Sequence, residues 1–359
     1  MNCEPGGDPS TLVVRLRESV RLDRYLTGHL PHVSRRRIQR HIERGDVLVD
    51  GRRVRPSHRL HGGETLLLPP LAARRLAVVA ATLELRIVYE DAEIVVVDKP
   101  AGLVMHPVGP EARRTLLGAV YRHLEARGEP AGEIGIVHRL DRLTSGLVVV
   151  AKRLDARRRL SRDIEQRRLR RTYLGLVHGQ PPASSGSVDL FIRRDPRRPT
   201  RMQTLDAAAA RAANAQAPPR VSASGYSNPR LDGRARPART HYRILRRFPG
   251  ATLLQLELDS GRTHQIRVHL QALGTPLLGD PIYGSAEAGS AGEPRRDGSL
   301  PVSVGEPSPP TVAEGLPIAR PALHAARLEF AHPATGRWLR FAAPLPADVH
   351  ALVRALASR

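Results

Sequence analysis

Hydrophobic positions near the start of the chain recur at helical spacing. Residues 22–30 carry leucine at every fourth position, which predicts a helix. A second helix is expected to begin at an N-cap, Ser34, and to turn two isoleucines inward and several arginines outward. Residues 47–49 and 52–54 flank an Asp-Gly pair, which is typical of a tight hairpin, and residues 65–68 are expected to form a short strand. The pattern therefore predicts a small helix-helix-strand unit.

Beyond residue 83, short apolar runs alternate with amphipathic segments. The expected strands are 85–89, 94–97, 136–137, 147–151, 173–177, 240–245, 252–258, 323–330 and 338–341. The expected helices are 116–124, 154–169 and 347–356. Because strands and helices do not follow a regular β-α-β order, the pattern favours an α+β fold over a doubly wound sheet.

The length and the breaks in this pattern predict the domain organisation. The 359 residues exceed the usual size of one compact domain. We expect a small α/β domain at 14–69, a linker at 70–83 that begins with Pro-Pro, and a second domain at 84–359. Two stretches of that second domain, at about 207–238 and 285–318, have a composition that cannot hold a core. We expect both to be inserted loops.

The charge of the chain points to a polyanionic partner. There are 57 Lys and Arg against 35 Asp and Glu, a formal charge of +22, which attracts nucleic acid. A G+C-rich genome would also raise the arginine content, but thirteen of the arginines lie between residues 15 and 59. Four are expected to bind phosphate from the outer face of the second helix: Arg35, Arg36, Arg37 and Arg40. The alternative is a helical hairpin whose arginines are merely solvated.

The order of elements in this unit resembles the alpha-L RNA-binding domain that is shared with a small-subunit ribosomal protein. The resemblance implies that residues 14–69 bind RNA. A single cysteine, Cys3, excludes intrachain disulfides and thiolate metal clusters. Neither a signal-peptide pattern nor an apolar run of membrane-spanning length is present, so we expect a cytoplasmic protein that does not contact a membrane.

Nine residues between two predicted strands, 138–146, carry the chemistry. Their sequence is His-Arg-Leu-Asp-Arg-Leu-Thr-Ser-Gly, and we expect them to form a loop at a sheet edge, where catalytic residues are common. Taken alone, Asp141 would as readily cap its own turn. The whole segment, however, resembles the signature of the RluA family of RNA pseudouridine synthases.

Further blocks extend this resemblance over about residues 84–345. They are residues 97–107, 261–270, 279–284 and 323–325. The resemblance implies the pseudouridine synthase fold, a mixed and mainly antiparallel sheet with a central cleft. It also implies isomerisation of uridine to pseudouridine in RNA.

The same resemblance gives roles to four residues. Asp141 is the catalytic residue, and the sequence leaves open whether it attacks the sugar, attacks the uracil ring or deprotonates the ribose. Arg267 pairs with Asp141 and favours its ionised form, although a surface arginine is the alternative. Tyr173 stacks on the target uracil, although an isolated tyrosine is more often part of a core. Arg139 fills the space of the extruded nucleotide, unless it forms a local salt bridge.

Other residues of the matched blocks are expected to contact RNA or to position the site. The expected RNA contacts are His138, Arg142, Thr144 and Arg262. Thr263 is expected to cap a short helix that carries Arg267. His138, His264 and His269 show no metal-ligand spacing, so hydrogen bonding is expected of them. Since the reaction oxidises nothing, and since no phosphate-binding loop or His-Glu-x-x-His pair is present, we expect no cofactor, no nucleotide and no metal.

Two other classes of function compete with the synthase. A non-catalytic RNA-binding protein would not need Asp141. A glycosidase-like hydrolase generally needs two carboxylates about the bond that it cleaves, and the signature supplies one. Ribosomal RNA of the large subunit is the preferred substrate, transfer RNA is possible, and a monomer is the default expectation.

Overall fold

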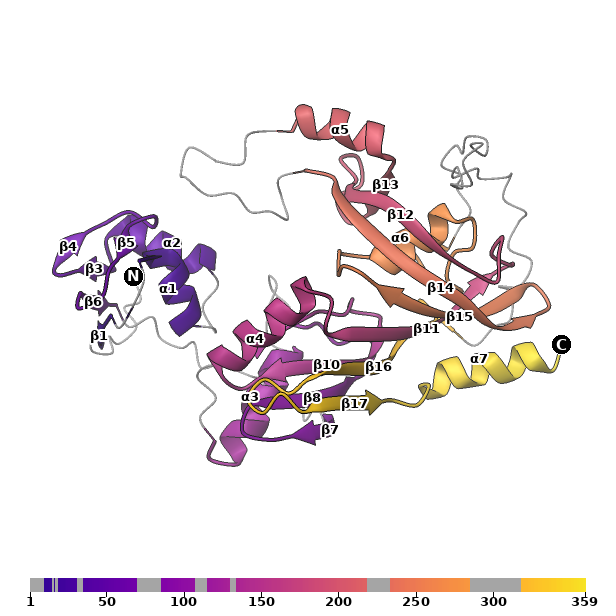
Figure 1. The fold of residues 1–359 in the computed structure, drawn as a ribbon, viewed down its shortest axis with the longest axis horizontal. Helices are drawn as coiled ribbons and strands as arrows, with labels where there is room; N and C mark the ends of the chain where they lie inside the picture. Colours follow the sequence, from indigo (N-terminus) through magenta and orange to yellow (C-terminus); the bar gives the residue numbers. More distant parts are fainter. Residues whose placement is uncertain are drawn as a thin grey trace, which may run out of the picture.

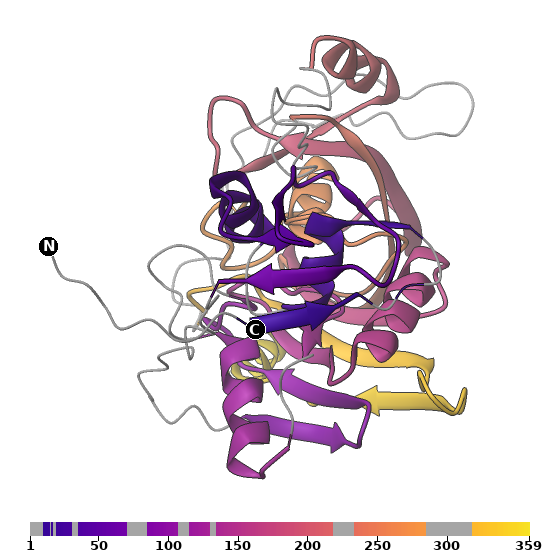
Figure 2. The same cartoon turned by 90° about the vertical axis from the view of Figure 1, so that its left-hand side faces the viewer.

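The N-terminal and C-terminal parts of the chain build separate hydrophobic cores. The computed structural model describes residues 10–14, 16, 19–30, 35–69, 85–106, 115–129, 134–217, 233–284 and 318–359. One core draws its buried side chains from residues 14–68, and the others draw theirs from residue 94 onward. The first part is indigo in Figures 1 and 2, and the second runs from purple to yellow.

The N-terminal unit combines two helices with short strands. Its elements are β1 Ser10–Val13, β2 Val20–Arg21, α1 Leu22–His29, α2 Arg35–Arg44, β3 Leu48–Val49, β4 Arg52–Arg53, β5 Arg59–Leu60 and β6 Thr65–Leu68. The strands pair in the order β1-β6-β3-β4, and β2 pairs with β5. The two helices, the hairpin and β6 follow the hydrophobic pattern, whereas β1, β2 and β5 were not predicted.

Helix spacing and turn chemistry explain this unit. Leu22 and Leu26 of α1 and Ile38 and Ile42 of α2 are almost fully buried in one core, because residues four apart share a helix face. The β3–β4 turn has a positive φ of 48° at its aspartate and 74° at its glycine. These are the dihedrals that an Asp-Gly hairpin turn requires, so the predicted hairpin is confirmed.

The second unit is built on one long sheet. Its strands are β7 Arg86–Glu90, β8 Ile94–Lys99, β9 Gly135–Ile136, β10 Ser145–Ala151, β11 Arg170–His178, β12 Ser185–Arg194, β13 Met202–Leu205, β14 Arg236–Phe248, β15 Ala251–Leu258, β16 Leu323–Ala331 and β17 Trp338–Ala342. Within the described residues these eleven strands follow the order β13-β12-β14-β15-β11-β16-β10-β8-β7, with β17 on β16 and β9 on β10. All of these pairs are antiparallel except β10–β16.

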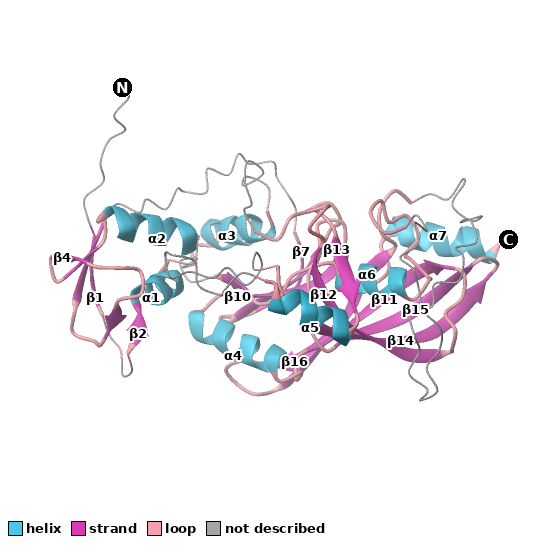
Figure 3. Ribbon diagram, turned by 90° about the horizontal axis from the view of Figure 1, so that it is seen from above, coloured by secondary structure: helices cyan, strands magenta, loops and turns pink. Residues whose placement is uncertain are grey.

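Helices cover both faces of this sheet. The helices are α3 Leu116–Ala126, α4 Leu154–Glu165, α5 Ala207–Ala215, α6 Gln265–Ala272 and α7 Ala347–Ala357. β10 is buried along its whole length, and its alternate side chains enter two cores. Val148 and Val150 pack with α3 and α6, whereas Leu147 and Val149 pack with α4. Figure 3 accordingly shows α4 on the opposite side of the sheet from α3 and α6.

The sequence pattern misplaced several segments. Residues 207–215 are not a loop but the helix α5, because Asp206 accepts a hydrogen bond from the Ala209 amide as an N-cap and alanine favours helix. β14 already begins at Arg236, inside the expected insertion, and β12 and β13 were not predicted. The basic helix ends at Glu165 rather than 169. The expected loop at 285–318 lies almost wholly outside the described residues.

Candidate active site

The signature segment forms a loop between β9 and β10 that backbone groups hold in place. The Val149 amide donates to Nε2 of His138 at 3.3 Å, and the Gly102 amide donates to the Arg142 carbonyl at 2.8 Å. The Thr144 amide closes a turn on the Asp141 carbonyl at 3.1 Å. β10 lies between β8 and β16, so the loop ends at an interior strand.

Two buried cations hold adjacent carbonyls of this loop. Lys99, fully buried at the end of β8, donates from Nζ to the Arg142 carbonyl at 3.2 Å and to the Leu103 carbonyl at 3.0 Å. Arg320 donates from Nη1 to the Leu143 carbonyl at 3.3 Å. Burial lowers the pKa of Lys99 to about 7, although the charge of Asp141 opposes the shift.

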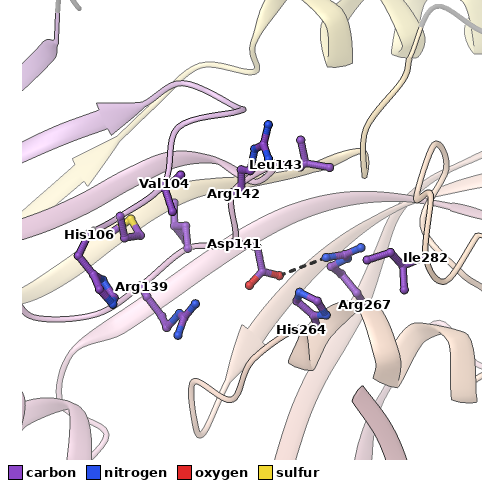
Figure 4. A pocket seen from close by; sticks show the side chains of 11 residues that line it. Val104, His106, Arg139, Asp141, Arg142, Leu143, His264, Arg267 and Ile282 are labelled. Atoms are coloured by element: carbon purple, nitrogen blue, oxygen red, sulfur yellow. Dashed lines mark ion pairs between the residues drawn. The ribbon is translucent and has the colours of Figure 1, made fainter. Parts of the chain in front are cut away.

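A cavity of about 300 Å³ opens beside the loop. Figure 4 shows it from close by. Its lining comes from the segment after β8, from the loop itself, from the start of α6 and from the segment 279–284 beyond that helix: Val104, Met105, His106, Arg139, Leu140, Asp141, Arg142, Leu143, His264, Arg267 and Ile282. Asp141 is the acid among them, with three arginines around it. The cavity therefore combines apolar side chains with one carboxylate and three arginines, which suits a planar base attached to a phosphate chain.

Arg267 connects Asp141 to a second, deeper carboxylate. Its Nη1 lies 3.7 Å from Oδ2 of Asp141, the pair joined by the dashed line in Figure 4. Its Nε and Nη2 donate to the two carboxylate oxygens of Asp280, each at 2.7 Å. Burial lowers the pKa of Arg267, but Asp280 and then Asp141 raise it above its ordinary value overall. The guanidinium is thus fixed in a fork, with one free edge turned toward Asp141.

The start of α6 sets the position of Arg267. The N-cap of this helix is His264, which has a left-handed backbone with φ 54°, so the prediction that Thr263 caps it is wrong. No side chain caps the helix; Gln265 instead holds the segment before it, because its Oε1 accepts from the Arg262 amide at 3.0 Å and from the Ser260 hydroxyl at 2.8 Å. Arg267 follows two residues later and is 3% exposed.

Tyr173 lies in the core on β11, next to the cavity but not in its lining. It is buried among apolar side chains that include Met105, Leu140 and Ile266, three residues near or within the cavity wall. Burial raises its pKa; the charge of Arg171 opposes this shift, and the charge of Asp141 adds to it.

Comparison with known proteins identifies the chain. A family model described as RNA pseudouridylate synthase matches residues 93–272, and one described as S4 domain matches residues 20–66. An uncharacterized RNA pseudouridine synthase of Chloroflexus aurantiacus is 41% identical over 94% of this chain and 90% of that protein. The ribosomal large subunit pseudouridine synthase D of Nitrosomonas europaea is 36% identical over 94% of this chain and 84% of that protein. The chain belongs to the RluA family of RNA pseudouridine synthases.

A solved structure has the same fold as the synthase. The human protein titled RNA Pseudouridylate Synthase Domain Containing 4 gives a TM-score of 0.51 and 24% identity, over 74% of this chain and 92% of that one. The predicted α+β fold with a mainly antiparallel sheet is therefore confirmed, as is an S4 domain near the N-terminus.

The structure separates the expected RNA contacts into two groups. Arg139 and Arg142 line the cavity. Arg262 is exposed, and its pKa is lowered by partial burial and by the charge of Arg236. Thr144 is 2% exposed and lies inside the protein.

His138 is also buried, and burial lowers its pKa to about 3, with the charge of Arg171 contributing. The imidazole is therefore neutral and accepts from the β10 backbone, which positions the loop. Arg40 of α2 is exposed, while the side chains of Arg35, Arg36 and Arg37 lie outside the described residues.

Sequence reasoning missed the roles of three residues that the synthase uses to build its site. They are Lys99, Asp280 and Arg320. A lysine at the end of a strand that begins with four aliphatic residues was a usable signal for Lys99, because a buried cation needs partners. Asp280 lies in the matched block 279–284, but the resemblance gave it no role, and no local sequence pattern distinguished Arg320.

Over the described ranges, no group of three or more His, Cys, Asp or Glu side chains could hold a metal ion. None of the helices that the structure describes is long and apolar enough to cross a membrane.

Proposed function

We propose that this synthase isomerises a uridine of large-subunit ribosomal RNA, with Asp141 as the catalytic residue. Relatives from Nitrosomonas europaea and Xanthomonas campestris, each 36% identical over 94% of this chain, are called ribosomal large subunit pseudouridine synthase D. The pairing of Asp141 with the buried Arg267 at the cavity is the observation that carries the assignment of the catalytic residue. Transfer RNA is the second candidate substrate.

The reaction needs a carboxylate that is ionised and able to reach the nucleotide. The C1′–N1 bond breaks, the uracil turns, a C1′–C5 bond forms, C5 loses a proton and N1 ends with one. Nothing is gained or lost overall. Asp141 is 17% exposed in a cavity of suitable size, so it can take any of three steps: attack at C1′, attack at the uracil ring, or removal of a ribose proton.

Arg267 places a positive charge beside Asp141 without blocking it. Two of its three nitrogens are taken by Asp280, so the third acts on Asp141 from 3.7 Å rather than through a short hydrogen bond. At that distance the positive charge stabilises the carboxylate, while the oxygens stay available to the substrate. An aspartate bound more tightly by its arginine would be a poorer nucleophile.

Tyr173 and Arg139 act on the base and on the RNA. We assign Tyr173 to contact with the uracil, which is supported by its burial in the same core as Met105 and Leu140 of the cavity wall and requires the cavity to extend toward β11. Arg139 is half-buried at the cavity wall and is assigned to the gap left by the extruded nucleotide. Arg142 and Arg262 would contact phosphates.

The N-terminal unit supplies sequence-independent RNA affinity. We assign residues 14–69 to this S4-type domain, 70–83 to a linker and 84–359 to the catalytic domain. The family model covers residues 20–66, and this unit has a core of its own. Its arginines neutralise phosphates and make binding dependent on salt. A monomer that acts in the cytoplasm is the expectation that accompanies this substrate.

Mapping of pseudouridine tests the substrate. Positions in large-subunit ribosomal RNA and in transfer RNA are compared between a strain with the gene and a strain without it. The purified protein is then incubated with transcripts of both RNAs. Loss of a large-subunit site, restored by the protein in vitro, supports the proposal. Loss confined to transfer RNA would replace the substrate, while free uracil as product would replace the reaction with hydrolysis.

A further inference from the structure

His264 lies on the cavity wall, and none of the assignments above uses it. Figure 4 shows its ring beside Asp141 and Arg267. Its backbone is in the left-handed region, with φ 54° and ψ 20°, at the point where the chain enters α6. A residue with a β-carbon adopts this conformation uncommonly. The chain thus holds an imidazole in the cavity on a strained residue, and strain of this kind gathers at functional sites.

A buried tyrosine determines which ring nitrogen of His264 carries the proton. Tyr283 is fully buried. Its hydroxyl oxygen accepts from the Met202 amide at 2.8 Å and lies 2.9 Å from Nδ1 of His264. Among the described residues these are the two hydrogen-bond partners of the hydroxyl, and the Met202 amide can only donate. The hydroxyl proton therefore points to Nδ1, since a buried donor without an acceptor is costly.

The opposite nitrogen of His264 is consequently an N–H donor in the cavity. Burial raises the pKa of Tyr283 to about 12, so its hydroxyl keeps its proton. Burial lowers the pKa of His264, although the charge of Asp141 opposes the shift, so the ring is neutral near pH 7. With Nδ1 accepting, the single ring proton is on Nε2.

Tyr283 is itself locked in position. The guanidinium carbons of Arg201 and Arg267 lie 5.2 and 5.0 Å from the centre of its ring, within the range of cation–π attraction. The rings of His264 and Tyr283 meet edge to face, at 82°. The imidazole therefore cannot turn over without breaking a packed and hydrogen-bonded arrangement.

We propose that His264 donates from Nε2 to a carbonyl oxygen of the target uracil, and that Tyr283 is the positioning residue that keeps it a donor. This rests on the proposed function. When the C1′–N1 bond breaks, its electron pair goes to the uracil ring, and the negative charge spreads over the two carbonyl oxygens. A preorganised donor binds that charged form more tightly than the uncharged substrate, which accelerates the step. The proton stays on Nε2 throughout.

Three variants separate this role from a structural one. His264→Asn is compatible with the left-handed backbone but is too short to place a donor where Nε2 lies. His264→Gln carries an amide N–H near that position. Tyr283→Phe removes the hydroxyl and leaves the ring. Single-turnover conversion and RNA affinity are measured for each on an RNA that the wild-type protein modifies.

We expect the asparagine variant to lose about 10²–10³-fold in rate with RNA affinity unchanged within about twofold. The rate of His264→Gln should be at least about tenfold higher than that of His264→Asn. The rate of Tyr283→Phe should lie between those of His264→Asn and the wild type. A His264→Asn protein that turns over at the wild-type rate would overturn the proposal.

Thiocarbonyl substrates supply the closing test. Sulfur accepts hydrogen bonds more weakly than oxygen, so RNA with 2-thiouridine or 4-thiouridine at the target weakens one contact. The wild-type protein should convert one of the two thiouridine RNAs more slowly than the unmodified RNA, and this difference in rate should disappear in His264→Asn. Equal thio effects in both proteins would refute the contact. Wild-type conversion of the unmodified RNA is the separate control: its failure would count against the proposed function, whereas only the ratios between variants bear on His264.

Discussion

Replacing Asp280 by asparagine should show how much the fork of Arg267 contributes. The change removes one negative charge and keeps the shape, and the retained oxygen can still accept from the Ile282 and Tyr283 amides, now at 2.9 and 3.0 Å. Arg267, whose side chain is 4% exposed, would then have Asp141 at 3.7 Å as its remaining charged partner. Breaking a buried ion pair by removing one partner costs about 3–5 kcal/mol. The free energy of unfolding should fall by that amount.

A second arginine in the same sheet domain provides a matched control. Arg320 uses the same two nitrogens on Asp348, at 2.6 and 2.8 Å, but the Asp348 side chain is 38% exposed. Water can replace much of what the Asp348→Asn change removes, so this variant should lose no more than about 1 kcal/mol. The two variants thus differ in burial rather than in hydrogen-bond geometry.

Urea unfolding followed by the fluorescence of Trp338 measures both variants. This is the single tryptophan of the chain, and it lies on β17, which pairs with β16 of the large sheet. Single-turnover activity should fall with Asp280→Asn as well, because the freed guanidinium moves onto Asp141. Equal stability losses for the two variants would refute the claim that burial makes the Arg267 fork strong.

Three further predictions concern backbone strain, pH and RNA affinity. Gly146 has φ 115°, and an added β-carbon would lie 2.3 Å from a backbone carbonyl of β16, so Gly146→Ala should lower the free energy of unfolding by more than about 1 kcal/mol. Gly179 has φ 66° and nothing within 4 Å of an added β-carbon, so Gly179→Ala should cost clearly less. Equal losses in urea unfolding would contradict the clash. In the folded protein His138 and His269 have pKa values of about 3 and 4, whereas in the unfolded chain both lie at about 6.5. The unfolded chain therefore takes up protons first, and the free energy of unfolding should fall from pH 6.5 toward pH 4 by up to about 1.4 kcal/mol per pH unit for each histidine. A His269→Gln protein with the same pH slope in urea unfolding would argue against this. Deleting residues 1–75 should weaken RNA binding and flatten its dependence on salt in a titration, and unchanged binding would remove the N-terminal unit from the interface.

The sequence predicted the parts of the site that local patterns and the family signature report. The apolar runs on either side of 138–146 placed the loop between strands, and the signature identified Asp141 within it. The pairing with Arg267 came from the family resemblance, and the structure places the two side chains 3.7 Å apart. No local pattern could have joined residues that lie on different elements of the sheet domain.

What the sequence missed depends on long-range contacts. Lys99 matters because three carbonyls from two segments converge on its amine, and convergence of this kind leaves no periodic trace. β12 was overlooked because only two of its ten residues are buried, so polar positions obscured the alternation of the strand. The first part of the alanine-rich insertion was read as a loop from its composition, although Asp206 before it is a helix-capping residue.

Conversion of uridine by an Asp141→Asn protein tests the central claim most directly. The change removes the negative charge, keeps the size of the side chain and leaves the hydrogen bond from the Thr144 amide to the Asp141 carbonyl intact. The account predicts a folded protein that binds RNA as the wild type does and forms no pseudouridine above the uncatalysed background. Pseudouridine formed at the wild-type rate would contradict it.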